Sequence, residues 1–506
     1  MNKSRALLRL LSLPLVGFLG GAGISALSPG NFWMGWLAAG LLLFICVFLL
    51  QAAWRWAGRG RILAWMMVLA FVLRLFIGVG LSQALPVYGD DEVVQNAGYL
   101  FYDAYHRDQQ AWQLAVSDQS LLAAFSQEYS MDQYGGLLII SAAIYRILSP
   151  DAMRPLLILI LTAFAGAIGV PFFWKSINHR WGEGVAMAST WIFSLYPESI
   201  LLGASQMREP FLLGLSAIAF WVVVGYEKNG KNIWRILAGL TSLGIMVVFS
   251  WRAALPIAVM LAVWFWVENL SENHFLRITG LIILLFSGIA VIFFSWKWLA
   301  DAASWDALLT LRASGMVQNI LEQLPESLHL PFITGYGLAQ PVLPATIIET
   351  ALPLRKGISI YRSIGWYALI PILIYGFFTV FKAQPRKDRR ILFWTMGFCI
   401  VWILISSLRA GGDMWDNPRY RTMFLVWLAL MAGWSWIWAQ RHHDPWIWRW
   451  FVVEGIFLVF FTQWYLSRYF KVGSKLPFFV VTGVIVGVCL AFLLGCWIWD
   501  YYRKKG

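Results

Sequence analysis

Near the C-terminus, twenty uncharged residues follow one another from Phe478 to Trp497, with the sequence FFVVTGVIVGVCLAFLLGCW. An α-helix rises about 1.5 Å per residue, so a run of roughly 20 apolar residues crosses the hydrocarbon core of a bilayer, which is about 30 Å thick. Runs of similar length occupy Phe32–Leu50, Ile62–Leu81 and Ile278–Phe294. They are not the short alternating segments of a membrane β-barrel. The pattern predicts an all-α polytopic membrane protein.

The composition points the same way. Hydrophobic residues make up 60% of the 506 residues and charged residues only 13%, against roughly 45–50% and about 25% in soluble proteins. The formal net charge of +13 does not indicate a nucleic-acid partner, because the basic residues lie mostly in short linkers between apolar runs. All four cysteines lie inside apolar runs, which indicates neither a metal cluster nor a loop disulfide.

The linker charges predict the orientation. We expect about 14 transmembrane helices of this kind, at residues 7–28, 33–53, 62–82, 155–174, 185–203, 210–226, 236–252, 255–268, 278–295, 364–381, 391–408, 422–439, 450–467 and 476–497. With the N-terminus in the cytoplasm, the most basic linkers also fall there, as the positive-inside rule requires. This predicts a multi-pass protein of the cytoplasmic (inner) membrane with both termini in the cytoplasm. The apolar run at 135–148 is too short to span, so we expect an interfacial helix.

Two long segments then face outward, at about 83–135 and 296–363. The first begins with Gly89-Asp90-Asp91-Glu92, directly after the third predicted span. A carboxylate at the membrane edge can act as a general base. The same residues can instead form a solvated acidic turn that caps a helix beginning near Val93. The spacing alone leaves both interpretations open.

Several features follow one another along residues 85–440. They are Asp91-Glu92 through Tyr99, an aromatic-led apolar helix at 134–148, a basic turn at 173–182, Pro197 followed by Ser205-Gln206-Met207-Arg208-Glu209, and Pro418-Arg419-Tyr420-Arg421 at the start of a late span. This order resembles the GT-C fold glycosyltransferases, in the bacterial branch related to protein O-mannosyltransferases and the lipid A aminoarabinose transferase. The resemblance implies that residues 1–60 add two N-terminal transmembrane helices to a catalytic transmembrane module at 61–295. That module includes the outward acidic loop 83–135, and the outward loop segment 296–363 and the C-terminal transmembrane helices at 364–506 follow it.

The resemblance also implies an activity. The enzyme would move a sugar, with inversion, from a polyprenyl-phosphate-linked donor to an acceptor hydroxyl at the outward face, and the acceptor would be a glycan, a lipid or a protein. Asp91 would be the catalytic base, with Glu92 and Glu209 as further catalytic residues. The residues expected to bind substrate are Asp90, Tyr99, Arg208, Arg252, Arg419 and Arg421. Arginine suits the leaving lipid phosphate because its planar fork binds phosphate oxygens in pairs.

The sequence also bears on cofactors and on alternative functions. The proposed reaction requires no metal, because arginine can neutralise a monophosphate leaving group. The acidic cluster could hold a divalent cation through its oxygens, but we do not favour this interpretation. A lipid-linked glycan flippase or transporter would predict charges in mid-span and broken helices, and Arg74 is the one clear mid-span charge. A polysaccharide polymerase or ligase would call for an outer loop rich in arginine and histidine. In a non-enzymatic scaffold, the acidic loop would only contact a partner.

Overall fold

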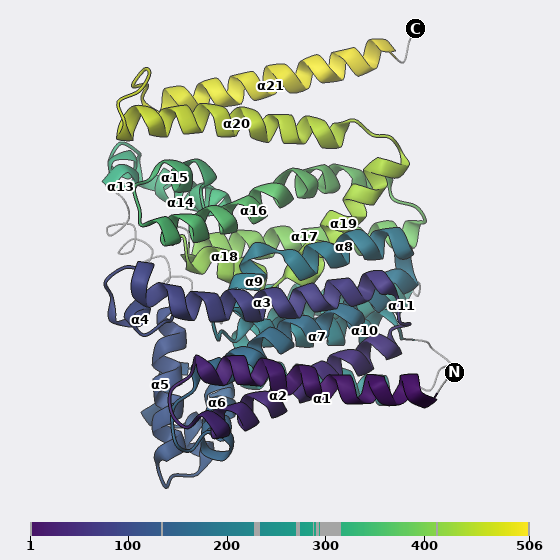
Figure 1. Cartoon of the computed structure of the whole chain (residues 1–506). Helices are drawn as coiled ribbons and strands as arrows, with labels where there is room; N and C mark the ends of the chain where they lie inside the picture. The colour runs from purple at the N-terminus through teal and green to yellow at the C-terminus, as the bar shows by residue number, and fades with distance from the viewer. Residues whose placement is uncertain are drawn as a thin grey trace. The chain divides into compact units, whose positions relative to one another are not determined.

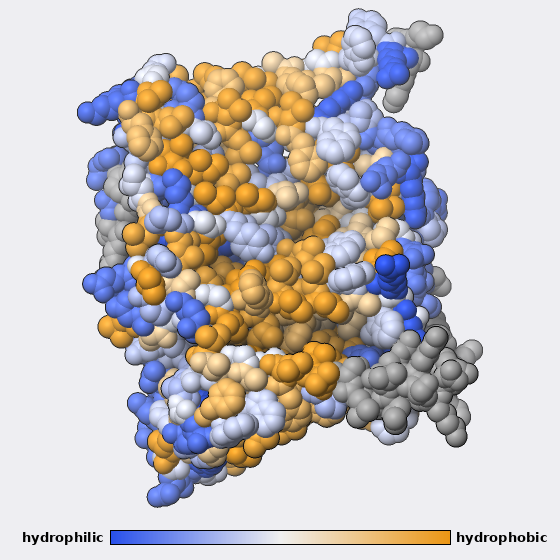
Figure 2. All heavy atoms as spheres, viewed as in Figure 1, coloured by the Kyte–Doolittle hydropathy of each residue, from blue (hydrophilic) through white to orange (hydrophobic). Residues whose placement is uncertain are grey.

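The computed structural model describes residues 3–132, 135–226, 233–269, 274–286, 288–289, 293, 315–410 and 413–503. Within these ranges the chain forms α-helices and short 3-10 helices and no β-strand. Among the described residues, eight helices are long and apolar enough to cross a membrane, or up to ten if each of two bent helix pairs counts as one span. The protein is therefore an all-α, polytopic membrane protein. Figure 2 shows hydrophobic side chains over the middle of the helices and hydrophilic ones near their ends, on the face in view.

The chain forms two compact units. The first contains residues 1–265 and 422–430, and the second contains 266–421 and 431–506. The elements of the first unit are α1 (Lys3–Ala26), α2 (Phe32–Trp56), α3 (Arg61–Tyr88), α4 (Val93–Asn96), α5 (Tyr102–Val116), η1 (Leu121–Phe125), η2 (Gln127–Asp132), α6 (Gly136–Leu148), α7 (Pro155–Trp181), α8 (Glu183–Leu195), α9 (Pro197–Gly203), α10 (Glu209–Val224) and α11 (Ile233–Asn269), which runs to Phe265 within this unit (Figure 1).

The first two helices pack through small residues. A Cβ atom added to Gly21 of α1 would lie 2.6 Å from the backbone nitrogen of Gly40 in α2. A Cβ atom on Gly40 would in turn lie 2.4 Å from the ring of Phe18. Small residues let two membrane helices approach closely enough for their backbones to touch. Side chains at these positions would separate α1 from α2.

Helix α11 contains a reversal of direction. Ser250 has an extended backbone (φ −171°, ψ 99°). The rings of Phe249 and Phe211 stack with centroids 4.7 Å apart, and Phe211 lies near the first residue of α10. The rings of Tyr226 and Phe265 lie 5.1 Å apart, and Arg235 donates a hydrogen bond to the Gly225 carbonyl. Both ends of this 37-residue element therefore lie near the C-terminal end of α10, and its middle lies near the N-terminal end of α10. This is the arrangement expected for two antiparallel spans at 236–252 and 255–268.

The predicted span at 185–203 is broken. Helices α8 and α9 meet at an angle of 48°, where Pro197 supplies no backbone donor. Arg74 of α3 lies at this break and is 1% exposed. Its Nη1 donates to the Ser194 carbonyl over 3.1 Å, and its Nη2 donates to the Ser199 hydroxyl over 2.7 Å. The carbonyl end of a helix carries partial negative charge, so the break accommodates a cation within a predicted span.

The second unit is also helical. The elements are a helix at 274–286, α13 (Gly315–Glu322), α14 (Glu326–Ala339), α15 (Leu343–Ile348), α16 (Pro353–Thr379), η3 (Val380–Lys382), α17 (Arg386–Ala410), α18 (Asp416–Thr422), α19 (Leu425–Arg441), α20 (Trp446–Tyr469) and α21 (Phe478–Arg503), with residues 422–430 counted in the first unit. The part of the predicted outward segment 296–363 from residue 315 onward is mostly helical; residues 296–314 lie outside the described residues. Helices α18 and α19 form the second bent pair, at 73°.

About 14 spans were predicted, and every predicted span coincides with a helix where the structure describes it. The number of long apolar helices is lower for identifiable reasons. Helix α10 has 16 residues, α11 combines two predicted spans, and the predicted span at 278–295 is described only in part. Helix α6 has 13 residues, about 20 Å of helix, so it is too short to span, as predicted.

Candidate functional site

The acidic turn after α3 is held by amide side chains. The Asp90 backbone N–H donates to Gln95 Oε1 over 2.7 Å, and Gln95 Nε2 donates to Asp90 Oδ2 over 3.2 Å. Asn96 Nδ2 donates to Asp91 Oδ1 over 3.0 Å. Glu92 occupies the position before α4, but its side chain makes no capping hydrogen bond. Asp91 and Glu92 are exposed, so both carboxylates can be reached from outside the protein.

Tyr99, a predicted substrate-binding residue, instead contacts a buried carboxylate. Its hydroxyl donates to Asp108 Oδ2 over 2.6 Å, and the Tyr145 hydroxyl donates to Asp108 Oδ1, also over 2.6 Å. Asp108 is 3% exposed. Burial raises its pKa to about 6, and the two hydrogen bonds and the nearby Arg107 oppose this rise. Asp108 was not predicted; in the sequence, its neighbour Arg107 is the only strong base of the acidic segment.

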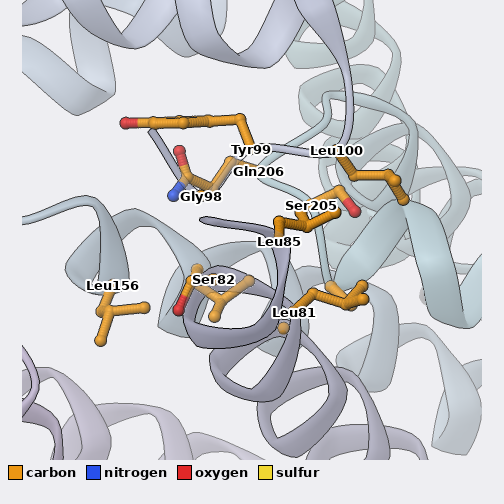
Figure 3. A pocket seen from close by; sticks show the side chains of 12 residues that line it. Leu81, Ser82, Leu85, Gly98, Tyr99, Leu100, Leu156, Ser205 and Gln206 are labelled. Carbon is orange, nitrogen blue, oxygen red and sulfur yellow. The ribbon is translucent and has the colours of Figure 1, made fainter. Parts of the chain in front are cut away.

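The chain on either side of the acidic turn packs against the segment that precedes Arg208. A cavity of about 20 Å³ is lined by α3, by residues 98–100, by α7 and by residues 204–206 (Figure 3). Arg107 Nη1 also donates to the Gln206 carbonyl over 3.1 Å. One water needs at least roughly 10–15 Å³, so this cavity has room for about one water and is not a sugar site. It shows that two predicted motifs more than one hundred residues apart in the sequence meet in the fold.

Arg208 and Glu209 begin α10 and are buried. Arg208 is 9% exposed and Glu209 0%, so neither of these predicted site residues forms an open surface. The preceding Gln206 has φ of +53°, a left-handed conformation that is uncommon for residues other than glycine. Its Nε2 donates to the Pro155 carbonyl over 2.9 Å. Among the described residues, Gln206 Oε1 has no hydrogen-bond partner.

Arg252 lies at the same end of the helices. It follows the reversal at Ser250, its side chain is exposed, and its guanidinium lies 5.6 Å from the centre of the Trp251 ring. The Phe249–Phe211 stack places the reversal beside the start of α10, where Arg208 and Glu209 lie. A Cβ atom on Gly136 would lie 2.5 Å from the Val248 carbonyl oxygen, so the start of α6 packs there too. The turn after α3, α6, the start of α10 and the reversal of α11 therefore share one end of the first unit.

Arg419 and Arg421 belong to the second unit and are buried within it. Arg419 Nη1 lies 3.4 Å from Asp416 Oδ1. Arg421 Nη2 donates to the Gln340 carbonyl over 2.8 Å, and its guanidinium lies 3.5 Å from the centre of the Trp366 ring. Nearby, a third buried arginine that was not predicted, Arg362, donates to the Trp415 carbonyl over 2.9 Å.

Metal-binding residues do not group in the parts of the chain that the structure describes: no set of three or more His, Cys, Asp or Glu side chains there could hold an ion. His442 bonds the Trp438 carbonyl over 2.9 Å. Asp444 accepts hydrogen bonds of 3.0 Å from the Trp446 backbone N–H and the Tyr375 hydroxyl. These contacts order the turn between α19 and α20.

Comparisons with known proteins add no family: a scan against protein-family models and a search of curated proteins both gave no match.

Proposed function

We propose that this protein is an inverting glycosyltransferase of the GT-C type. It would act at the outer face of the cytoplasmic membrane and move a sugar from a polyprenyl-phosphate-linked donor to the hydroxyl of a glycan, lipid or protein acceptor. One observation carries the proposal. The chain on either side of the exposed acidic turn, in α3 and at residues 98–100, packs with the segment 204–206, which leads into Arg208 and Glu209. The start of α6 lies at the same end of the first unit.

The chemistry needs a base and a stabilised leaving group. Asp91 accepts the proton of the acceptor hydroxyl as the acceptor oxygen attacks the anomeric carbon. The bond between that carbon and the phosphate oxygen breaks, and the lipid leaves as a phosphate monoester. An exposed carboxylate oriented by the Asn96 amide suits the first task. Arg252 is the exposed arginine at this end of the unit and suits the second.

The other predicted residues act around this centre. Asp90 and Glu92 flank the base, and Tyr99 orders the chain behind the turn through Asp108. Glu209 and Arg208 are buried at the start of α10, and their predicted catalytic and substrate-binding roles stay predictions. Arg419 and Arg421 belong to the second unit, and their role in substrate binding stays a prediction. A divalent cation is not required, because arginine can stabilise a monophosphate.

Turnover by purified variants tests the proposal. The assay follows release of polyprenyl phosphate from a panel of polyprenyl-phosphate sugars, with and without acceptor extracts. Asp91→Asn keeps the size and the Asn96 contact but removes the base, so we expect turnover to fall by about 10²–10⁴-fold. The matched control is Asp118→Asn, an exposed carboxylate of the same outward segment. Wild-type turnover by Asp91→Asn would show that Asp91 is not the base.

A second candidate is a transporter or flippase for a lipid-linked glycan. The observation that favours it is the broken span α8–α9 with the buried cation Arg74 at the break, since discontinuous helices line many transporter sites. This cation is already bonded to Ser194 and Ser199, which gives it a structural role, and we therefore place the transferase first.

A further inference from the structure

The opposite end of the first unit contains a second cavity, of about 50 Å³. It is lined by residues of α7, of α10 and its C-cap, and of the start of α11; Figure 1 labels these three helices. Its lining includes Lys175, His179, Trp221, Gly225 and Arg235. The glycosyltransferase proposal uses none of them, and their role does not depend on it.

The cavity is built on an aromatic cluster. The Trp56 and Trp221 rings lie 5.0 Å apart, nearly perpendicular, and Phe172 packs against Trp56 at 4.8 Å. Lys175 Nζ lies 4.0 Å from the centre of the Trp56 ring, and the Arg235 guanidinium lies 5.3 Å from the centre of the Trp221 ring. The cluster fixes one cation on each of two adjoining rings, so both charges face the same concavity.

Both cations bond to backbone carbonyl groups. Lys175 donates to the Trp56 carbonyl over 3.4 Å, and Arg235 donates to the Gly225 carbonyl. Of the residues that the structure describes, none forms an ion pair with either cation. The exposed His179 also lines the cavity. Two like charges at one site repel each other, and a bound anion would attract both cations and offset that repulsion.

The size and position of the cavity define the anion. At roughly 10–15 Å³ for each water, 50 Å³ holds about three to five oxygen-sized atoms, which is the size of a phosphate group. Lys175 lies six residues before the end of α7 at Trp181, about 9 Å along the helix. Tryptophan side chains concentrate at the depth of lipid headgroups. We propose that this cavity binds the phosphate group of an anionic phospholipid, with Lys175 and Arg235 as its ligands.

Native mass spectrometry of the full-length protein in detergent tests this. The protein is titrated with phosphatidylglycerol and, separately, with phosphatidylcholine of the same acyl chains. We expect the wild type to bind one phosphatidylglycerol in preference to phosphatidylcholine. The double variant Lys175→Gln/Arg235→Gln should bind it about tenfold or more weakly, because each ligand makes a charge-assisted contact.

The control is Arg59→Gln/Arg61→Gln, which removes the same charge from exposed positions in a predicted linker of the same unit; its affinity should stay within about twofold of the wild type. Equal weakening in both double variants, or equal binding of the two lipids by the wild type, would overturn the proposal. Displacement of the lipid by millimolar inorganic phosphate would also overturn it, because the site would then bind free phosphate. If Lys175→Gln/Arg235→Gln does not fold, Lys175→Arg is tested in its place. This variant keeps the charge and must keep the preference for phosphatidylglycerol; loss of that preference would refute Lys175 as a phosphate ligand.

Discussion

Asp108 should make the stability of the first unit depend on pH, and Asp108→Asn should remove that dependence. Burial raises the pKa of Asp108 from an ordinary value of 3.8 to about 6 in the folded protein. Between these values the folded state holds a proton that the unfolded state releases. Stability therefore falls as the pH rises from about 4 to about 6, and the loss is complete above the folded pKa. A shift of about two units corresponds to about 3 kcal/mol.

The measurable part of this effect is a difference between variants. Between pH 4.5 and pH 7.5, we expect Asp108→Asn to gain about 2 kcal/mol in free energy of unfolding relative to the wild type. Asparagine has the same shape and can still accept from one tyrosine hydroxyl and donate to the other. Tyr145→Phe removes a hydrogen bond that lowers the pKa of Asp108, so its pH-dependent loss should extend to higher pH.

The assay is unfolding in mixed micelles by titration with sodium dodecyl sulfate, followed by tryptophan fluorescence at pH 4.5, 6.0 and 7.5. Asp118→Asn is the matched control, because that carboxylate is exposed and should leave the pH profile unchanged. If the wild type and Asp108→Asn show parallel profiles, the buried Asp108 does not hold a proton in this range, and the reasoning is refuted.

Two further predictions concern packing. A Cβ atom on Gly203 would lie 2.5 Å from Arg74 Cδ, so Gly203→Ala should lower the free energy of unfolding by about 1–3 kcal/mol. The control Gly80→Ala in α3 has nothing within 4 Å of the added carbon and should leave the free energy of unfolding equal or slightly higher. An equal effect of the two substitutions would contradict the close contact at Gly203. Arg154 is 1% exposed and donates to both carboxylate oxygens of Asp151, at 2.6 and 2.7 Å. Asp151→Asn should therefore destabilise the protein by about 1–3 kcal/mol. An unchanged unfolding curve would show that this pair does not stabilise the turn between α6 and α7.

The spans were predictable because they depend on apolar length, which the sequence shows directly. The breaks were not, because hydropathy counts residues and does not report where backbone hydrogen bonds are interrupted. Pro197 was a local signal of the break between α8 and α9. The role of Arg74 was not visible, since its partners Ser194 and Ser199 lie 120 and 125 residues away in the sequence.

In the candidate site too, local features were predictable from the sequence and tertiary contacts were not. The exposed acidic turn was predicted from Asp91 and Glu92, whose surroundings are local in sequence. Tyr99 was predicted to bind substrate but lies on Asp108, because nothing in the sequence shows which tyrosines will reach a buried carboxylate. Arg421 was predicted from its place at the start of a span. The stacking on Trp366, 55 residues away, depends on tertiary packing that the sequence does not show.

Reconstitution into proteoliposomes tests most directly whether the protein cleaves the bond between a sugar and a lipid phosphate. Purified protein is reconstituted with a polyprenyl-phosphate donor labelled in both the sugar and the lipid, and the lipid products and the leaflet of intact donor are measured together. We expect the wild type, and not Asp91→Asn, to release free polyprenyl phosphate in an amount equal to the transferred or released sugar. Movement of intact donor between the leaflets without cleavage would contradict it and identify a transporter instead.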